Sequence, residues 1–505
     1  MYEYCIGIDF GTTNTRTSYF VDGERKFLTT LPSVIFVDEA GEVSVGLAAQ
    51  NKGAVQPENM IGSAKKYIGN LEIDKTWNCN GYIYNSTDSA VEILKEIRRQ
   101  FIEWNNLEEN VEIGAVITVP AIFNDNQRSE IRKAGEIADF EILWILEDST
   151  AAAIEIFHDK IIDNKILIID IGGGTFDISI LEKDGQTYRA LAIDGEDNFG
   201  GDDFDRIIFQ RLIYQIEDEV KINLSNSFTA MIAESEYNKL LNRLMIEARR
   251  IKENLSSSER CEITLNDLVK FDGKSYSLHF TISRAEFDEM CRPLYEKIFD
   301  RLENFILENN LRLEEIGSLI LAGGTCQIPY IRQKISGALG KVPEKLSEDL
   351  RLTASGAARV AEMKNAEENL KLESVLPHSL GVAIMNFERK MVFDRLLAKG
   401  TPYPCEVTRE YETAFNNQTR IDVNIYEAGN EKESDLKFHR FRGTLSLKNL
   451  PPAPKGKTFV DVKFEYTEDQ SLRVTAIDKQ RANHFERQII EKPARLEEKF
   501  YDKRN

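Results

Sequence analysis

Hydrophobic positions recur at three- and four-residue spacing in several stretches of the first 365 residues, and this spacing predicts amphipathic helices. The same region contains short β-branched runs bounded by glycine, aspartate or proline, which are typical of strands. Alternation of the two patterns indicates an α/β domain. The predicted helices are 89–104, 126–138, 236–255 and 285–309, and the predicted strands are 4–9, 114–119, 165–170 and 317–322.

The pattern changes to a period of two after about residue 377. Ile421, Val423 and Ile425 alternate with Asp422 and Asn424, and a second run of this kind follows later in the chain. Such alternation predicts half-buried antiparallel strands, so we expect an all-β sandwich. The chain is therefore divided into an α/β domain at 1–365, a linker at 366–376, a β-sandwich at 377–492 and a charged tail at 493–505.

An internal repeat relates two of the predicted strands. The segment 6–15 (IGIDFGTTNT) is similar to 167–176 (LIIDIGGGTF): each is an apolar strand that ends in an aspartate, Asp9 or Asp170, followed by glycine and threonine. The two copies are too far apart for a solenoid repeat. They predict a duplicated, two-lobed domain that resembles the actin/hexokinase type, with one phosphate-binding hairpin in each lobe.

The residues after each aspartate suit a polyphosphate. Glycine lets backbone N–H groups approach an anion closely, and threonine adds hydroxyl groups. An aspartate repels phosphate unless a cation lies between them, so Asp9 and Asp170 imply Mg²⁺. No GxxxxGK[ST] motif is present, and the glycines at 172–174 precede a strand pattern rather than a helix, which argues against P-loop and Rossmann sites. A simple tight turn is the alternative reading of these glycines.

Charged residues nearby are candidates for catalysis. Lys65 could stabilise the transferred phosphate, although a surface lysine is the alternative. Glu147 and Asp148 precede a helical pattern and could act as the acid, although helix capping is the alternative. Glycine pairs at 200–201 and 323–324 extend the set of phosphate- and nucleoside-binding candidates.

The composition limits the classes of function. The formal net charge of -20 argues against a large nucleic-acid interface. The six cysteines lack metal-ligand spacing, and no apolar run reaches the length of a membrane helix. We therefore expect a cytoplasmic, monomeric protein without nucleic-acid or membrane partners.

Six motifs occur in order along the chain: IDFGTTNT (8–15), VPAIFNDNQR (119–128), DIGGGTFDISIL (170–181), GGDDFD (200–205), LSSS (255–258) and LAGGTCQIP (321–329). Together they resemble the heat-shock 70 (DnaK-like) chaperone family, and the resemblance covers about residues 4–490. It implies an ATP/ADP-binding domain with Mg²⁺, followed by a sandwich that binds extended polypeptide clients, with a J-domain co-chaperone and a nucleotide-exchange factor as further partners. By the same resemblance, a proline–arginine pair, Pro120 and Arg128, would relay nucleotide state between the domains.

The resemblance also assigns roles to individual residues. The implied catalytic residues are Lys65, Asp148, Asp170 and Thr175, and Asp9 and Asp170 are implied to hold the metal. The implied nucleotide-binding residues are Gly11, Thr12, Thr13, Asn14, Gly172, Gly173, Gly174, Asp177, Gly200, Gly201, Asp202, Lys252, Ser256, Gly323 and Gly324. The implied peptide-binding residues are Val382, Met385, Ala414, Ile421 and Val423.

The chain departs from the family pattern at the nucleoside end. Arg249 stands where the family has a glutamate, Glu253 where it has a cation, Gln327 where it has an arginine, and Leu350 where it has an aspartate. The family's catalytic glutamate aligns with Asp148, which is one methylene shorter. The family continues after about residue 492 with a helical lid, whereas this sequence ends in a short charged tail, so we expect fast peptide exchange.

Two functions follow as hypotheses. The first is an ATP-driven chaperone in which hydrolysis controls peptide exchange. The second is a nucleotide-binding scaffold or regulator with weak or no hydrolysis, which the departures favour. A sugar kinase or a filament-forming actin relative is disfavoured, because the β-sandwich has no role in either.

Overall fold

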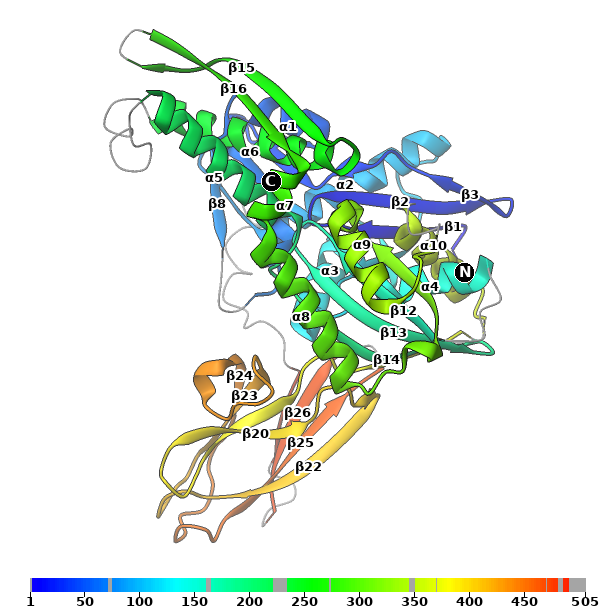
Figure 1. Ribbon diagram of the computed structural model, residues 1–505. Helices are drawn as coiled ribbons and strands as arrows, with labels where there is room; N and C mark the ends of the chain where they lie inside the picture. The colour runs from blue at the N-terminus through cyan, green and yellow to red at the C-terminus, as the bar shows by residue number, and fades with distance from the viewer. Residues whose placement is uncertain are drawn as a thin grey trace.

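The chain folds into two α/β lobes joined to a smaller unit of two β-sheets, as the computed structural model shows (Figure 1). The β unit, coloured yellow to red, lies below the lobes in Figure 1. This architecture confirms the predicted α/β domain followed by antiparallel β-sheets. No helix within the described ranges is long and apolar enough to cross a membrane. The structure describes residues 2–70, 75–159, 165–220, 234–271, 274–344, 350–368, 370–468, 470–479 and 485–489.

The first lobe is built on a sheet with the strand order β11-β10-β1-β2-β3. Strand β1 (Tyr4–Phe10) is parallel to β10 (Ile113–Val119) and antiparallel to β2 (Asn14–Val21), so the first hairpin lies at the centre of the sheet. The other elements are β3 (Glu24–Phe27), β4 (Leu31–Pro32), β5 (Val34–Val37), β6 (Val43–Val45), α1 (Leu47–Gly53), η1 (Pro57–Asn59), β7 (Met60–Gly62), η2 (Ala64–Tyr67), β8 (Thr76–Cys79), β9 (Tyr82–Asn85), α2 (Ser86–Asn105), α3 (Asp125–Ile137), β11 (Glu141–Glu147) and α4 (Asp148–Asp159).

The second lobe repeats this plan. Strand β12 (Lys165–Ile171) is parallel to β17 (Ile316–Ala322) and antiparallel to β13 (Phe176–Asp184). Strands β1 and β12, which contain Asp9 and Asp170, therefore each have one parallel neighbour and one antiparallel hairpin partner. The duplication read from the sequence thus corresponds to a duplicated topology. The other elements are β14 (Thr187–Glu196), α5 (Gly201–Val220), α6 (Glu234–Ser257), β15 (Arg260–Phe271), β16 (Lys274–Ser283), η3 (Leu313–Glu315), η4 (Gly324–Gln327), α9 (Pro329–Leu339) and α10 (Leu352–Asn365).

The prediction of a single helix over 285–309 is wrong, because the structure contains two helices in this segment. Helix α7 (Arg284–Met290) ends before Cys291, and α8 (Arg292–Glu308) begins after it. Pro293 lies in the first turn of α8. Proline lacks an N–H and clashes with the preceding turn, so it is tolerated at a helix start and interrupts a helix interior.

The third unit consists of two four-stranded antiparallel sheets, ordered β20-β19-β23-β24 and β22-β25-β26-β27. Buried Val460, Val462 and Phe464 alternate with less buried residues along β25 (Phe459–Tyr466), as the period-two pattern predicts. The other strands are β19 (Leu380–Met385), β20 (Met391–Leu397), β22 (Cys405–Glu412), β23 (Ile421–Ala428), β24 (His439–Leu447), β26 (Leu472–Asp478) and β27 (Phe485–Ile489), with the short helix η6 (Leu436–Phe438) before β24.

The segment between the lobes and the sandwich is itself a strand. Strand β18 (Lys371–Val375) pairs in parallel with β14 and antiparallel with β21 (Pro402–Tyr403). The predicted linker at 366–376 therefore extends the sheet of the second lobe into the sandwich. This backbone pairing connects the two parts more firmly than a free linker would.

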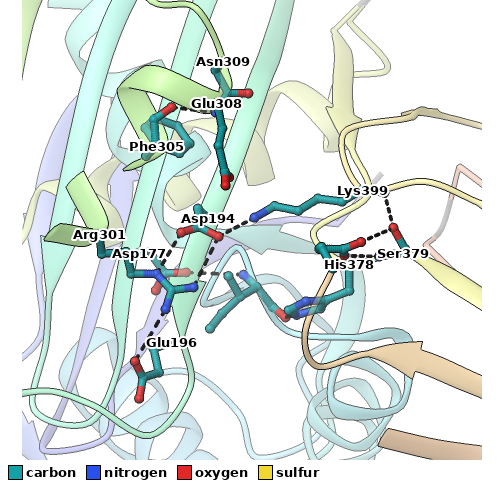
Figure 2. A network of polar contacts seen from close by, with 12 residues as sticks. Asp177, Asp194, Glu196, Arg301, Phe305, Glu308, Asn309, His378, Ser379 and Lys399 are labelled. Carbon is teal, nitrogen blue, oxygen red and sulfur yellow. Dashed lines mark hydrogen bonds and ion pairs between the residues drawn. The ribbon is translucent and has the colours of Figure 1, made fainter. Parts of the chain in front are cut away.

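Polar side chains also cross this junction (Figure 2). Lys399 of the sandwich pairs with Asp194 of β14, which also binds Arg301 of α8 with 2.8 Å between Nε and Oδ2. His378, just before the sandwich, places Nε2 3.2 Å from the carbonyl oxygen of Ile122 in the first lobe. The sandwich is thus in contact with both lobes.

Candidate functional site

A cavity of about 360 Å³ is lined by the loops of both hairpins, by helix α6 and by the loop after β17. The fold therefore gathers glycines, threonines and aspartates that are far apart in the sequence. Sixteen of the predicted site residues line it: Asp9, Gly11, Thr12, Thr13, Asn14, Lys65, Asp148, Asp170, Gly172, Gly173, Thr175, Asp202, Lys252, Ser256, Gly323 and Gly324.

Four predicted nucleotide-binding residues are not in this lining: Gly174, Asp177, Gly200 and Gly201. The N–H of Gly201 donates to the carbonyl oxygen of Gly172 at 2.9 Å, and a Cβ on Gly200 would lie 2.8 Å from the same oxygen. These two glycines therefore pack behind the loop of the second hairpin. Asp177 is almost fully buried next to the loop.

Gly323 has a backbone that a larger residue could not adopt easily. Its φ is +77°, and a Cβ there would lie 2.3 Å from the carbonyl oxygen of Ile171 and 2.5 Å from Oδ1 of Asp170. The loop after β17 can therefore approach the second hairpin only because residue 323 has no side chain.

We expect Gly323→Ala to weaken Mg²⁺–ATP binding by about 5- to 150-fold, because strain and steric clash of this kind amount to about 1–3 kcal/mol. Isothermal titration calorimetry measures the loss. Gly337→Ala is the matched control, since Gly337 lies in α9 with open space around a Cβ, and it should leave affinity unchanged. Equal affinity of the Gly323 variant and the wild type would show that the loop does not shape the site.

Three carboxylates line the phosphate end of the cavity. Burial, the charge of Asp148 and the charge of Asp9 raise the pKa of Asp170 to about 7, and burial with the charge of Asp148 raises the pKa of Asp9 to about 6. Burial likewise raises the pKa of Asp177 well above its usual value. Oδ1 of Asp148 is buried without a hydrogen-bond partner among the described residues. An oxygen-rich, negatively charged pocket of this kind suits a hard divalent cation such as Mg²⁺.

Lys65 projects into this acidic region from the short helix η2. Its side chain is 4% exposed, and Nζ lies 3.9 Å from Oδ2 of Asp148. The rings of Phe10 and Phe123 lie 5.9 and 5.7 Å from the same ammonium group. The lysine is therefore buried, which contradicts the alternative reading of a surface lysine.

Arg249 forms part of an ionic cluster at the nucleoside end. It binds Asp202 through Nη2 and Asp205 through Nε, each at 3.1 Å, from helix α6 to helix α5. Lys66 of the first lobe also binds Asp202, at 2.7 Å, and Lys252 binds Asp205, at 2.7 Å. The cluster joins the two lobes across the cavity and keeps Arg249 paired with aspartates.

Glu147 and Asp148 separate into different environments. Asp148 lines the cavity, whereas Glu147 does not. Oε1 of Glu147 accepts a hydrogen bond from the Tyr403 hydroxyl at 3.0 Å and lies 3.4 Å from Arg128. The carboxylate of Glu147 therefore lies at the junction with the sandwich, and of the two acidic candidates only Asp148 faces the cavity.

The predicted peptide-binding residues differ in exposure. Val382 and Val423 are 3% and 5% exposed and belong to the sandwich core. Ile421 and Ala414 are partly buried, and Met385 is 40% exposed. Val382 and Val423 therefore pack in the core of the sandwich, whereas Met385 presents an apolar side chain to solvent.

Sequence reasoning missed several residues that belong to these regions. Arg16 and Thr353 line the cavity, and the Thr325 hydroxyl donates to the carbonyl oxygen of Gly172 at 2.8 Å. Phe415, next to Ala414, is 59% exposed. Arg16 could have been found by extending the sequence repeat by one residue, whereas Thr353 carries no local signal.

Comparison with known proteins gives the relationship of the whole chain. The model of the family described as "Hsp70 protein" matches residues 5–503. A chaperone protein DnaK of Halobacterium salinarum is 31% identical over 488 residues, which cover 95% of this chain and 74% of the relative. The chaperone protein dnaK of Guillardia theta is 32% identical, with 94% and 77% covered. Heat shock 70 kDa protein 6, chloroplastic, of Arabidopsis thaliana is 29% identical, with 94% and 68% covered. The chain therefore belongs to the Hsp70 family.

Proposed function

We propose that this chain is an ATP-dependent chaperone in which Mg²⁺–nucleotide in the cavity controls exchange of an extended apolar peptide on the sandwich. The supporting observation is a hydrogen-bonded path between the two regions (Figure 2). Oδ1 of Asp177 accepts the N–H of Ile122 at 3.3 Å, and the carbonyl oxygen of Ile122 lies 3.2 Å from Nε2 of His378. A change of charge next to Asp177 would therefore affect the position of His378 through one intervening residue, Ile122.

The residues of the cavity have separate roles in this proposal. The loops at 11–14 and 172–175 would hold the phosphates through backbone N–H and threonine hydroxyl groups. Lys65 would stabilise the negative charge that develops as the terminal phosphoryl group is transferred to water. Asp148, 3.9 Å from Lys65, would orient that water. Mg²⁺, held on the side of Asp170, would offset phosphate charge.

The proposed peptide binding is supported by exposed apolar side chains of the sandwich. Met385 at the end of β19 and Phe415 in the loop before β23 are both more than a third exposed. An extended peptide would gain affinity from backbone hydrogen bonds and selectivity from apolar contacts of this kind. Extended, apolar segments of unfolded proteins are the substrate class that fits.

Peptide release tests the proposal. We expect ATP to accelerate the release of a fluorescent leucine-rich peptide by about 5- to 150-fold relative to ADP, the usual range for coupled sites. Fluorescence anisotropy during chase with unlabelled peptide measures the rate, and a peptide with leucine replaced by aspartate is the control. Equal rates in ATP and ADP would contradict nucleotide control.

The second candidate, a nucleotide-binding scaffold with weak hydrolysis, is favoured by one observation. Arg249 is paired with Asp202 and Asp205, and the buried Nε2 atom of the partly exposed Gln327 has no hydrogen-bond partner among the described residues. The charged and polar groups at the nucleoside end of the cavity therefore differ from those of the family pattern. Tight nucleotide binding without single-turnover hydrolysis would favour this candidate over the first.

A further inference from the structure

The two hairpins carry opposite charges at equivalent positions. In the first hairpin, Asp9 of β1 lies opposite Arg16 of β2. In the second, Asp170 of β12 lies opposite Asp177 of β13. Arg16 and Asp177 each follow their aspartate by seven residues, so the sequence repeat relates them directly. One hairpin therefore presents a neutral pair, and the other presents two carboxyl groups.

Arg16 lines the cavity and is largely buried. Its Nη1 lies 3.5 Å from Oδ2 of Asp9, and the two side chains are 18% and 14% exposed. Arg16 lines the cavity with Asp9, Asp148 and Asp170, whereas its counterpart Asp177 does not. A guanidinium group carries five N–H donors in a planar fork, far more than one carboxylate oxygen at 3.5 Å can use.

The charges in the cavity are arranged asymmetrically. Asp9 is paired with Arg16, and Asp148 is 3.9 Å from Lys65. Asp170 and Asp177 have no ion pair closer than 4 Å among the described residues. The carboxyl groups without a cationic partner are therefore concentrated on the second hairpin, where a divalent cation gains most.

We propose that Arg16 is a tethered cation of the nucleotide site, which binds the polyphosphate from the first hairpin while the metal is held on the second. This inference rests on the proposed function, because it names the group that recognises the nucleotide's phosphates. The guanidinium contributes charge-assisted hydrogen bonds that remain when the metal is absent. Asp9 then orients Arg16 and is not the principal ligand of the metal.

The competing explanation is that Arg16 only neutralises Asp9. The two explanations differ in one measurable quantity, the factor by which removing Mg²⁺ weakens ATP binding. A phosphate-binding arginine interacts more strongly with the polyphosphate when no metal offsets the phosphate charge, so it makes the wild type less dependent on Mg²⁺ than a variant without the arginine. A purely structural counter-ion leaves that factor unchanged, although it changes the thermal stability of the empty protein.

The test is calorimetric titration of ATP into the full chain, once with excess Mg²⁺ and once with EDTA. We expect the loss of affinity on Mg²⁺ removal to be at least about tenfold larger in Arg16→Gln than in the wild type, because the guanidinium group meets the full charge of the polyphosphate only when the metal is absent. Arg16→Lys, which keeps the charge, should fall between them. Equal Mg²⁺ dependence of Arg16→Gln and the wild type would overturn the inference.

A double variant makes the result independent of folding defects. Asp9→Asn together with Arg16→Gln removes both members of the pair, so no buried carboxylate is left unpaired. The inference predicts the enlarged Mg²⁺ dependence in this variant as well, whereas a structural counter-ion predicts the wild-type value. If the wild type binds no ATP even with Mg²⁺, the proposed function fails; if it does bind but the variants keep its Mg²⁺ dependence, only this inference fails.

Discussion

Lys65→Met is expected to slow single-turnover hydrolysis of ATP by about 10²- to 10³-fold, the usual effect of removing one group that stabilises a transition-state charge. The affinity for Mg²⁺–ATP should change much less, because the charge that Lys65 meets develops during the reaction. Methionine retains the length of the side chain between the rings of Phe10 and Phe123, so the packing is preserved. Rapid mixing with labelled ATP measures the rate.

Lys66→Met is the matched control, because Lys66 is the next residue and is also largely buried. Its ammonium group binds Asp202 at 2.7 Å across the two lobes, away from Asp148. We expect this variant to keep the rate of hydrolysis and to release nucleotide faster. A Lys65→Met protein that hydrolyses ATP as fast as Lys66→Met would contradict the proposed role of Lys65.

The two glycine-containing hairpins could be predicted because their signal is local. Asp9 and Asp170 each lie one residue before the end of a strand, and the glycines and threonines of the hairpin loop begin two residues after each aspartate. Lys65 carried no such signal. Its burial against two phenylalanine rings comes from segments far apart in the chain, which periodicity does not report.

The roles of neighbouring residues could not be predicted, because they depend on the junction with the sandwich. Glu147 and Asp148 are adjacent in the sequence, yet Glu147 accepts a hydrogen bond from the Tyr403 hydroxyl, whereas Asp148 lines the cavity. Likewise, Lys371 lies between two leucines in the sequence but is exposed at the start of strand β18, where its ammonium group pairs with Glu373 at 2.6 Å. Its charge is therefore compatible with pairing to β14.

A buried ionic triad also lies at this junction and was not visible in the sequence. Arg442 of β24 is 2% exposed and binds both Asp125, the first residue of α3, and Glu427 of β23. The arginine thus joins the first lobe to the sandwich. Burial raises the pKa of Asp125 despite Arg442, whereas the charges of His378, Arg442 and Arg440 outweigh burial and lower the pKa of Glu427.

Arg442→Met is expected to weaken the contact between lobe and sandwich by about 3–5 kcal/mol, because removing one partner leaves buried carboxylates without compensation. The accelerating effect of ATP on peptide release should then fall to about twofold or less, since a coupling of 1–3 kcal/mol cannot survive loss of the contact. Anisotropy in ATP and in ADP gives the ratio.

Two comparisons separate coupling from simple destabilisation. Arg440→Gln removes a neighbouring arginine that is 41% exposed and contacts Asp197 at 3.3 Å and Glu427 at 3.7 Å, and the pairs of such a partly exposed arginine contribute about 1 kcal/mol or less. The triple variant Asp125→Asn, Glu427→Gln and Arg442→Met removes all three charges, so no carboxylate is left buried and unpaired. If the triple variant restores the stability of the junction but not the effect of ATP, the charges themselves transmit the nucleotide state. If it restores both, the triad only holds the sandwich in place, and the path through Ile122 and His378 carries the coupling.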